Sequence, residues 1–246
     1  MPTSSEPGAG RPSAPHRHAV LVTHESCGGP DDTGAVHGLL ADRGFRVTRH
    51  SVFPHGEARD PDLALPDPGD ADLVVLFGSF AHAWEERHHA WVAAEVDWVR
   101  RVLAHDVPYI GICFGGQILA AAWGGGIEPI GATELGMLTF PTRPDCPVPD
   151  GPWFTWHSDR AVLPPDAEVW ARNDYGPQAF ARGRAIGVQF HPEVTQELVE
   201  SWIRTDEAAL DAAYGAEKLR TEVAAAVGTS RANLSTFLDR VIAAWA

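Results

Sequence analysis

Short apolar segments alternate with amphipathic ones along most of this chain. The apolar segments predict strands over residues 19–23, 45–50, 72–77, 107–112 and 186–190. The amphipathic segments predict helices over residues 34–43 and 84–105, from Gln117 onward, from Thr195 through Leu210, and around residues 234–245. Alternation of this kind favours a mainly parallel sheet with helices on both faces.

We therefore expect a three-layer α/β fold. At 246 residues, one large domain with a sizeable core is the simplest organisation. Residues 1–17 are rich in Pro, Ser, Gly and Arg and predict a disordered tail. We expect a single domain over residues 18–246, ending in helices that begin near residue 195. The apolar stripe of the last helix is typical of core packing, and a docking face for another subunit is the alternative.

Charge and cysteine content narrow the class of protein. A formal net charge of -14 argues against nucleic acid or an anionic membrane as partner. No apolar run approaches the 18 or so residues of a membrane span, and the N-terminus lacks the apolar core of a secretory signal. The three cysteines are far apart in sequence, so a reduced, cytoplasmic protein is expected.

Cys113 lies where a predicted buried strand meets a predicted helix. Gly115 and Gly116 follow almost at once and permit a sharp turn with close backbone approaches. A cysteine at such an elbow is near the helix N-terminus, which favours the thiolate and offers N–H groups to an oxyanion. The alternative is that Cys113 is a small buried apolar residue, as most free cysteines are.

A candidate base follows the strand predicted over residues 186–190. His191 ends this strand, Pro192 keeps it extended, and Glu193 lies two residues beyond it. A cysteine nucleophile needs a base, and the base needs an acceptor that orients it. Because strand ends carry the sites of open α/β sheets, we expect Cys113, His191 and Glu193 to form a triad.

The two motifs that carry these residues resemble those of a known family. Gly111-Ile-Cys-Phe-Gly-Gly-Gln117 together with Gln189-Phe-His-Pro-Glu193 is similar to the class I (triad) glutamine amidotransferases, in particular to free-standing domains like the glutaminase part of GMP synthetase. The resemblance runs from about His18 to about Trp202. It implies a flavodoxin-like fold and a Cys–His–Glu triad. This triad releases ammonia from glutamine through a γ-glutamyl thioester, and we expect no cofactor.

The resemblance also implies an oxyanion hole built from backbone N–H groups. In the family, a Gly-Gly-Pro turn supplies one donor and the residue after the cysteine supplies the other, which here are Ser79 and Phe114. This chain departs from the pattern because Gly78 is followed by Ser79 and Phe80. If the turn needs positive φ, a serine costs about 1 kcal/mol; the alternative is that Ser79 occupies an ordinary allowed turn.

Substrate-binding positions follow by the same resemblance. The turn residue Gly78, Gln117 of the elbow helix and Glu134 of a Glu-x-Gly element correspond to the family's glutamine pocket. His157 and Ser158 correspond to a segment whose backbone binds the α-carboxylate and amino groups of glutamine. The alternatives are that Glu134 is an exposed edge residue and that His157 is the base in place of His191.

Three histidines raise the question of a metal. His82, His88 and His89 lie close in sequence, but adjacent helical histidines point about 100° apart and no HExxH spacing is present. We therefore expect a solvated face and no metal.

The expected function is hydrolysis of glutamine, with ammonia passed to a partner synthetase in trans, because 246 residues leave no room for a synthetase module. A γ-glutamyl amide or peptide hydrolase acting alone is the second hypothesis. A non-catalytic regulatory homologue is the third, motivated by the altered Gly78-Ser79-Phe80 turn.

Overall fold

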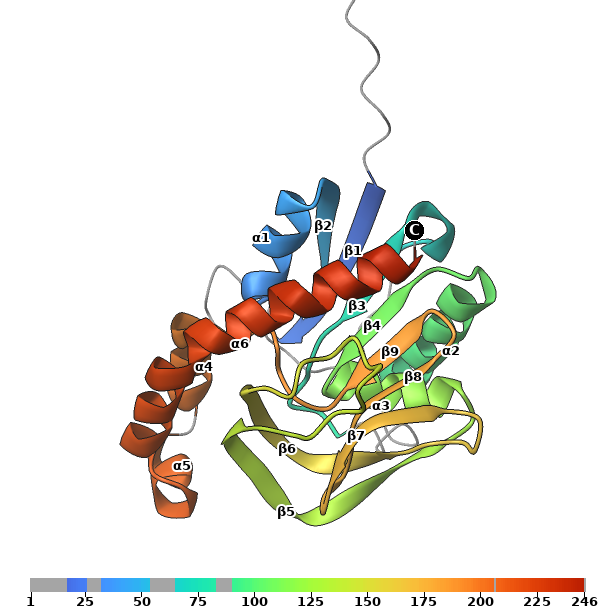
Figure 1. Cartoon of the computed structure of the whole chain (residues 1–246). Coiled ribbons are helices and arrows are strands. Elements are labelled where there is room, and N and C mark those ends of the chain that lie inside the picture. Colours follow the sequence, from blue (N-terminus) through green and yellow to red (C-terminus); the bar gives the residue numbers. More distant parts are fainter. Residues whose placement is uncertain (1–16, 26–31, 54–64, 83–89, 206, 246) are drawn as a thin grey trace, which may run out of the picture.

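The computed structural model describes residues 17–25, 32–53, 65–82, 90–205 and 207–245 (Figure 1). Except for Arg17, the predicted tail therefore lies outside the described residues. The elements follow in the order β1 (Arg17–Glu25), α1 (Ala35–Asp42), β2 (Phe45–Phe53), the 3₁₀ helix η1 (Pro68–Asp70), β3 (Leu73–Leu76), α2 (Ala90–Ala104), β4 (Tyr109–Ile112), α3 (Phe114–Ala122), β5 (Gly126–Leu138), β6 (Trp153–Val162), β7 (Glu168–Asn173), β8 (Gly176–Arg182), β9 (Ala185–Val188), α4 (Gln196–Ile203), α5 (Glu207–Ala213) and α6 (Ala216–Trp245).

The described strands form a large sheet and a small one. The large sheet has the order β2-β1-β3-β4-β9-β8-β7, and β5 pairs separately with β6. The pairs β2–β1, β1–β3, β3–β4 and β4–β9 are parallel. The pairs β9–β8 and β8–β7 are antiparallel. This mainly parallel sheet confirms the predicted α/β class. In β4 and β9, Ile112 lies opposite Val188, so the residues that follow both strands emerge at one edge.

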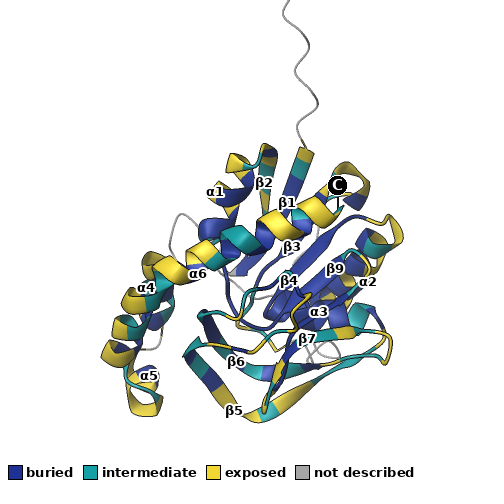
Figure 2. Ribbon diagram, in the orientation of Figure 1, coloured by how far each residue is buried: buried dark blue, intermediate teal, exposed yellow. Residues whose placement is uncertain are grey.

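Alternate strand residues enter two separate cores, as a sheet buried on both faces requires. Leu21, Val75 and Ile110 pack on one face with apolar residues of α1 and α6. Val22 and Val74 pack on the other face with apolar residues of α2 and α3. Figure 2 shows the central strands as dark blue, buried ribbon between helices whose outer surfaces are exposed. The helices therefore form the two outer layers of the predicted three-layer fold.

Several predicted helices have different bounds in the structure, and the last one, predicted around residues 234–245, runs from Ala216 to Trp245 as α6. The elbow helix α3 begins at Phe114, three residues before the predicted start at Gln117. The helix predicted from Thr195 through Leu210 is interrupted, because α4 ends at Ile203 and α5 starts at Glu207. The Thr205 backbone N–H and hydroxyl both donate to the Trp202 carbonyl, and this tight turn closes α4. The Thr195 side chain accepts from the Leu198 N–H and caps α4 at its start.

The last helix, α6, is 30 residues long and crosses the outside of the sheet (Figure 1). Leu234, Phe237, Leu238 and Val241 of the predicted stripe are buried in the core that α6 shares with α1. The core-packing interpretation of this stripe is thus confirmed. None of the described helices, α6 included, is long and apolar enough to cross a membrane.

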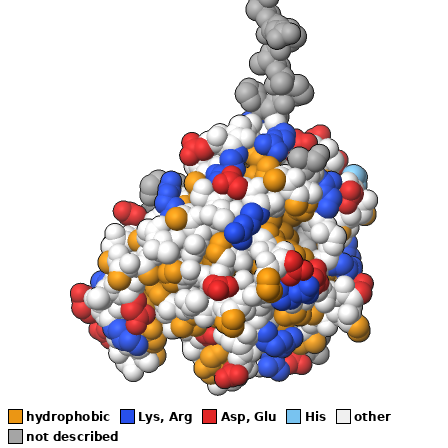
Figure 3. All heavy atoms as spheres, in the orientation of Figure 1, with side chains coloured by type: hydrophobic (Ala, Val, Ile, Leu, Met, Phe, Trp, Pro, Cys, Tyr) orange, Lys and Arg blue, Asp and Glu red, His pale blue; other side chains and the backbone are white. Residues whose placement is uncertain are grey.

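Acidic and basic side chains are interspersed with apolar ones on the face drawn in Figure 3. The sequence carries 33 acidic against 19 basic residues, so the whole chain is nevertheless strongly anionic.

Candidate active site

Cys113 occupies the turn between β4 and α3, with φ 51°. Its N–H donates to the Val188 carbonyl at 2.8 Å, and its carbonyl accepts from the N–H groups of Gly116 and Gln117. A Cβ at Gly115 would lie 2.1 Å from the Leu76 carbonyl oxygen, so only glycine allows α3 to start this close to β3. Positive φ at a non-glycine residue is costly, and here it holds the thiol on a sharp elbow.

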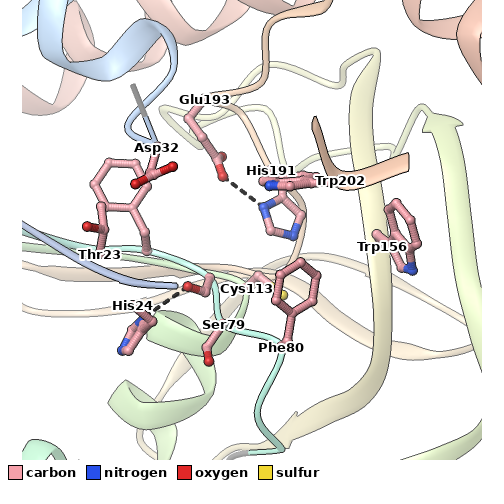
Figure 4. Close-up of a pocket in the computed structure, with 12 residues that line it drawn as sticks. Thr23, His24, Asp32, Ser79, Phe80, Cys113, Trp156, His191, Glu193 and Trp202 are labelled. Carbon is pink, nitrogen blue, oxygen red and sulfur yellow. Dashed lines mark hydrogen bonds and ion pairs between the residues drawn. The ribbon is translucent and has the colours of Figure 1, made fainter. Parts of the chain in front are cut away.

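His191 lies beside this elbow, just past the end of β9. Its N–H donates to the Phe154 carbonyl at 2.7 Å, which ties the segment to β6. Its Nδ1 lies 2.8 Å from Glu193 Oε1, and both side chains are buried (Figure 4). The Trp202 ring packs against the imidazole in an edge contact, with centroids 5.0 Å apart. The carboxylate and the aromatic ring together fix the orientation of the imidazole.

The charge state of His191 follows from its surroundings. Burial lowers the pKa of His191, but the charges of Glu193 and Cys113 and hydrogen bonds to both side chains outweigh burial and raise this pKa to about 10. Because Nδ1 faces Glu193, Nε2 is the nitrogen available to the thiol. The three candidate triad residues thus lie together, with the His191 imidazole in contact with both the Cys113 thiol and the Glu193 carboxylate.

A second polar group contacts the sulfur. The Gln189 side-chain amide donates to Cys113 Sγ at 3.6 Å, and its Oε1 accepts from Gln117 Nε2 at 3.3 Å. Gln117 Nε2 also donates to the Asp159 carbonyl. An N–H donor favours the charged form of a thiol. The Gln189 side chain therefore contacts the thiol directly, and Gln117 contacts Gln189.

The sulfur and the imidazole open into a cavity at the carboxyl edge of the sheet (Figure 4). Residues from β1, the turn after β3, the elbow, β6 and α4 line this cavity: Thr23, His24, Asp32, Phe77, Gly78, Ser79, Phe80, Cys113, Trp156, His191, Glu193 and Trp202. Of the predicted substrate-binding residues, Gly78 is in this lining, whereas Gln117, Glu134, His157 and Ser158 are outside it. A Cβ at Gly78 would lie 2.9 Å from His191 Cε1, which places this turn directly against the base.

Ser79 is not held in a left-handed conformation. Among the described residues other than glycine, only Cys113 and Asp106 have positive φ. The hypothesis of a strained serine is therefore wrong, and the ordinary allowed turn is what the structure has. Ser79 Oγ accepts from the Ala81 N–H at 3.0 Å, a local bond that stabilises the turn without glycine.

Glu134 and His157 form a buried polar network on β5 and β6. His157 Nε2 lies 2.6 Å from Glu134 Oε2, and its Nδ1 lies 2.9 Å from the Asp159 carbonyl oxygen. Asn173 and Gln178 donate to the same carboxylate. The alternative of an exposed Glu134 is wrong, since this residue is 4% exposed. With both ring nitrogens of His157 engaged, the geometry favours His191 as the base. Ser158 is half-buried, and its hydroxyl lies 3.0 Å from that of Thr133.

His82 is paired through Nδ1 with Asp159 Oδ2 at 2.6 Å, and its side chain is about half exposed. His88 and His89 lie outside the described residues.

Several cavity residues were not predicted from the sequence: His24, Asp32, Trp156 and Trp202. His24 could have been found, because it directly follows the strand predicted over residues 19–23 and thus shares the sheet edge with Cys113. Trp202 carried no such signal, because its contact with His191 depends on how α4 packs.

Comparison with known proteins adds a family relationship to this geometry. Residues 40–206 match the family model described as glutamine amidotransferase class-I. Among curated proteins, the chain is 33% identical over 168 residues to the GMP synthase [glutamine-hydrolyzing] of Thermus thermophilus, covering 63% of this chain and 33% of that protein. It is 41% identical over 110 residues to the enzyme of the same name from Thermomicrobium roseum, covering 42% and 21%. The chain thus spans between a fifth and a third of the length of these relatives.

Solved structures show the same fold. A glutamine amidotransferase from Thermotoga maritima superposes with a TM-score of 0.77 at 24% identity, covering 92% of this chain and 98% of that one. A glutamine amidotransferase from Methylobacillus flagellatus also has a TM-score of 0.77, at 20% identity, covering 91% and 94%.

Proposed function

Because this chain belongs to the class I glutamine amidotransferase family, we propose that it hydrolyses the side-chain amide of glutamine through a γ-glutamyl thioester on Cys113. The observation that carries the proposal is the convergence of Cys113, His191 and Glu193 on one cavity from two neighbouring parallel strands. A nucleophile, a base and an orienting carboxylate within contact of each other are the parts that covalent amide hydrolysis needs.

In the first half of the reaction, the Cys113 thiolate attacks the amide carbon and the carbonyl electrons move onto oxygen. Protonated His191 then gives its Nε2 proton to the amide nitrogen, and collapse of the tetrahedral intermediate breaks the C–N bond. Ammonia leaves and the thioester remains. In the second half, now neutral His191 takes a proton from water as the water oxygen attacks the thioester. Collapse of the second intermediate releases glutamate and restores the thiolate–imidazolium pair. Throughout, Glu193 keeps the imidazole in one orientation.

The negative oxygen of both intermediates needs donors. The Phe114 N–H lies in the first turn of α3, where N–H groups lack intrahelical partners, and the helix dipole adds to its effect. We assign the Ser79 N–H, on the turn that borders His191, as the second hydrogen-bond donor to this oxygen. Each such donor contributes about 2.7–4 kcal/mol to lowering the barrier.

We assign the predicted substrate-binding residues two kinds of role. Gly78 borders the reacting group, because it lies in the cavity wall. Gln117 and Glu134 are assigned to the glutamine pocket, and the backbone of His157 and Ser158 to binding the α-amino and carboxylate groups of glutamine. Gln117 additionally supports the thiolate through Gln189.

Covalent labelling tests the proposal. A diazoketone analogue of glutamine should add to the peptide that contains Cys113, as read by mass spectrometry after proteolysis. Cys146→Ala should label like the wild type, since burial raises the pKa of Cys146 to about 11 and suppresses its thiolate. Cys113→Ala should neither label at this peptide nor release ammonia from glutamine. Turnover at the wild-type rate in Cys113→Ala would contradict the proposal.

We further propose that the released ammonia is used by a synthetase in trans, in the cytoplasm. Support comes from the relatives, whose names describe glutamine-hydrolysing GMP synthases. A synthetase partner should raise the rate of glutamine hydrolysis when both proteins and the acceptor substrate are mixed.

Hydrolysis of larger γ-glutamyl amides is the second candidate. Four aromatic residues line the cavity, namely Phe77, Phe80, Trp156 and Trp202, and Phe80 is 56% exposed. An aromatic wall suits an apolar leaving amine better than ammonia. If this function is correct, kcat/KM should be higher for a γ-glutamyl anilide than for glutamine, and Phe80→Ala should remove the difference.

A further inference from the structure

A buried histidine–glutamate pair, His24 and Glu95, borders the cavity through His24 and lies outside the proposed triad. His24 Nε2 is 3.1 Å from both carboxylate oxygens of Glu95, and both side chains have 0% exposure. His24 belongs to β1 and Glu95 to α2. Taking two ionisable groups out of water is costly unless further hydrogen bonds hold them. The pair therefore calls for a role beyond packing.

The other nitrogen of His24 contacts the proposed oxyanion turn. Nδ1 lies 2.9 Å from the Gly78 carbonyl oxygen, as the dashed line in Figure 4 marks. A carbonyl only accepts, so Nδ1 carries a proton and donates it. The proton between Nε2 and Glu95 can sit on either partner without changing this donor. In both cases Glu95 holds the imidazole ring so that Nδ1 faces the Gly78 carbonyl.

Because of peptide geometry, the contact between His24 and the Gly78 carbonyl also determines the direction of the Ser79 N–H. The Gly78 carbonyl and the Ser79 N–H belong to one peptide unit, and in a trans peptide these two bonds point in opposite directions. Among the described residues, the cis peptide is at Gly151–Pro152, not here. By holding the carbonyl toward itself, His24 directs the Ser79 N–H to the opposite side of the turn. A Cβ at Gly78 would lie 2.9 Å from His191 Cε1 and 3.8 Å from Cys113 Cβ, so this turn borders the reacting residues.

His24 also contacts the residue that supplies the other donor. Its ring meets the Phe114 ring edge-on with centroids 4.9 Å apart, and Trp91 packs against both rings. One imidazole therefore contacts Phe114 and the carbonyl of the peptide unit that carries the Ser79 N–H.

We propose that His24 and Glu95 are positioning residues that set the orientation of the Gly78–Ser79 peptide and thereby assemble the oxyanion hole. This inference rests on the proposed function, because it assigns the pair a part in stabilising the tetrahedral intermediates. A donor that acts on the transition state changes kcat more than KM.

Two reactions of the same thiol separate this role from a structural one. Hydrolysis of glutamine, or of a γ-glutamyl anilide, passes through an oxyanion. Alkylation of Cys113 by iodoacetamide is displacement at a saturated carbon and forms none. His24→Leu should lower kcat for hydrolysis at least tenfold, approaching the loss of about 10²–10³ seen when an oxyanion donor is removed. KM and the alkylation rate should stay within about threefold of the wild type.

Conservative variants and a packing control complete the experiment. In His24→Asn the side-chain amide can replace the Nδ1 donor, and kcat should recover most of the loss. In Glu95→Gln the amide can donate to neutral Nε2 and keep the same tautomer, so kcat should fall less than in His24→Leu. Val99→Ala, one turn along the buried face of α2, should lower stability but leave kcat unchanged.

The outcomes are distinct. Equal kcat in His24→Leu and the wild type would overturn the positioning role while leaving the proposed function intact. A parallel loss of hydrolysis and alkylation in both His24 variants would also overturn it, because the defect would then be in the thiol or the fold. Absence of hydrolysis in the wild type itself would overturn the proposed function and this inference with it.

Discussion

At the scale of single residues, the proposed chemistry depends on three side chains, Cys113, His191 and Glu193, that lie in contact at the cavity. Glu193 and Cys113, on two sides of the imidazole, both favour the protonated form of His191. The Cys113–His191 pair is reactive only while buried and oriented, which the contacts from Trp202 and Gln189 secure.

The roles of the two partners of Cys113 predict an order of effects. Glu193→Gln should lower glutamine turnover less than His191→Ala, since the first change removes orientation and part of the charge while the second removes the proton carrier. Steady-state rates measured on glutamine check this. The reverse order would mean that base and orienting residue are misassigned.

The raised pKa of His191 also predicts a dependence of stability on pH. A group whose folded pKa exceeds its unfolded value, here about 10 against 6.5, stabilises the fold fully below the unfolded value. This contribution is lost as pH rises through about 10. Urea unfolding at pH 6, 8 and 10 should therefore show the advantage of the wild type over His191→Gln shrinking with increasing pH. A constant or growing difference would contradict the assigned charge state.

At the scale of elements, the site is a product of close approaches between strand ends and helix starts. The start of α3 touches β3, and the turn after β3 touches His191, so each neighbour restricts the backbone of the next. Much of this was predictable. The apolar run before Cys113 and the glycines after it predicted the elbow, and the strand before His191 predicted the base beside it.

What the sequence did not predict depends on long-range packing. The Glu134–His157 network needs β5 and β6 paired in one register, and nothing local to Glu134 indicates burial. The ordinary conformation of Ser79 depends on its own hydroxyl accepting from Ala81, which the comparison with a Gly-Gly-Pro turn obscured. The helix α4 ends in a turn around Thr205, and the apolar periodicity of the sequence does not indicate this turn.

Gly115→Ala tests the close approach between α3 and β3. Its Cβ would overlap the Leu76 carbonyl, so we expect a loss of roughly 1–3 kcal/mol or more in the free energy of unfolding and a displaced elbow with little turnover. Gly38→Ala is the matched control, because a Cβ there meets nothing within 4 Å in the middle of α1, and it should stabilise by roughly 0.5–1 kcal/mol. Chemical denaturation of both variants gives the comparison; similar stability in the two would refute the steric account.

Ser79→Gly has an expected direction now that the turn is known to be unstrained. Glycine removes the bond to the Ala81 N–H and widens the range of conformations open to the turn. We expect kcat on glutamine to fall a few-fold with KM little changed. A rise in kcat would mean that the serine does restrain the donor unfavourably.

At the scale of the whole molecule, α6 completes one face of the sheet. Phe237 is fully buried against residues from α1 and the central strands, so removing it leaves a cavity inside the main core. Phe237→Ala should cost about 3–5 kcal/mol in the free energy of unfolding, whereas the exposed Thr229→Ala on the same helix should be nearly neutral. A small effect of Phe237→Ala would contradict the contribution of this core contact to stability.

The pairing of β4 with β9 has a consequence for how the protein acquires activity. Cys113 and His191 sit on adjacent strands, yet four further strands of the chain, β5 to β8, lie between them in sequence. Bringing the two together closes a loop of nearly eighty residues, which is slow because its entropy must be lost before the contacts form. A refolding intermediate that lacks this closure has a cysteine but no base. If the proposed hydrolysis is correct, its return during refolding should therefore report the pairing of β4 with β9, and it should lag behind the return of the helical signal.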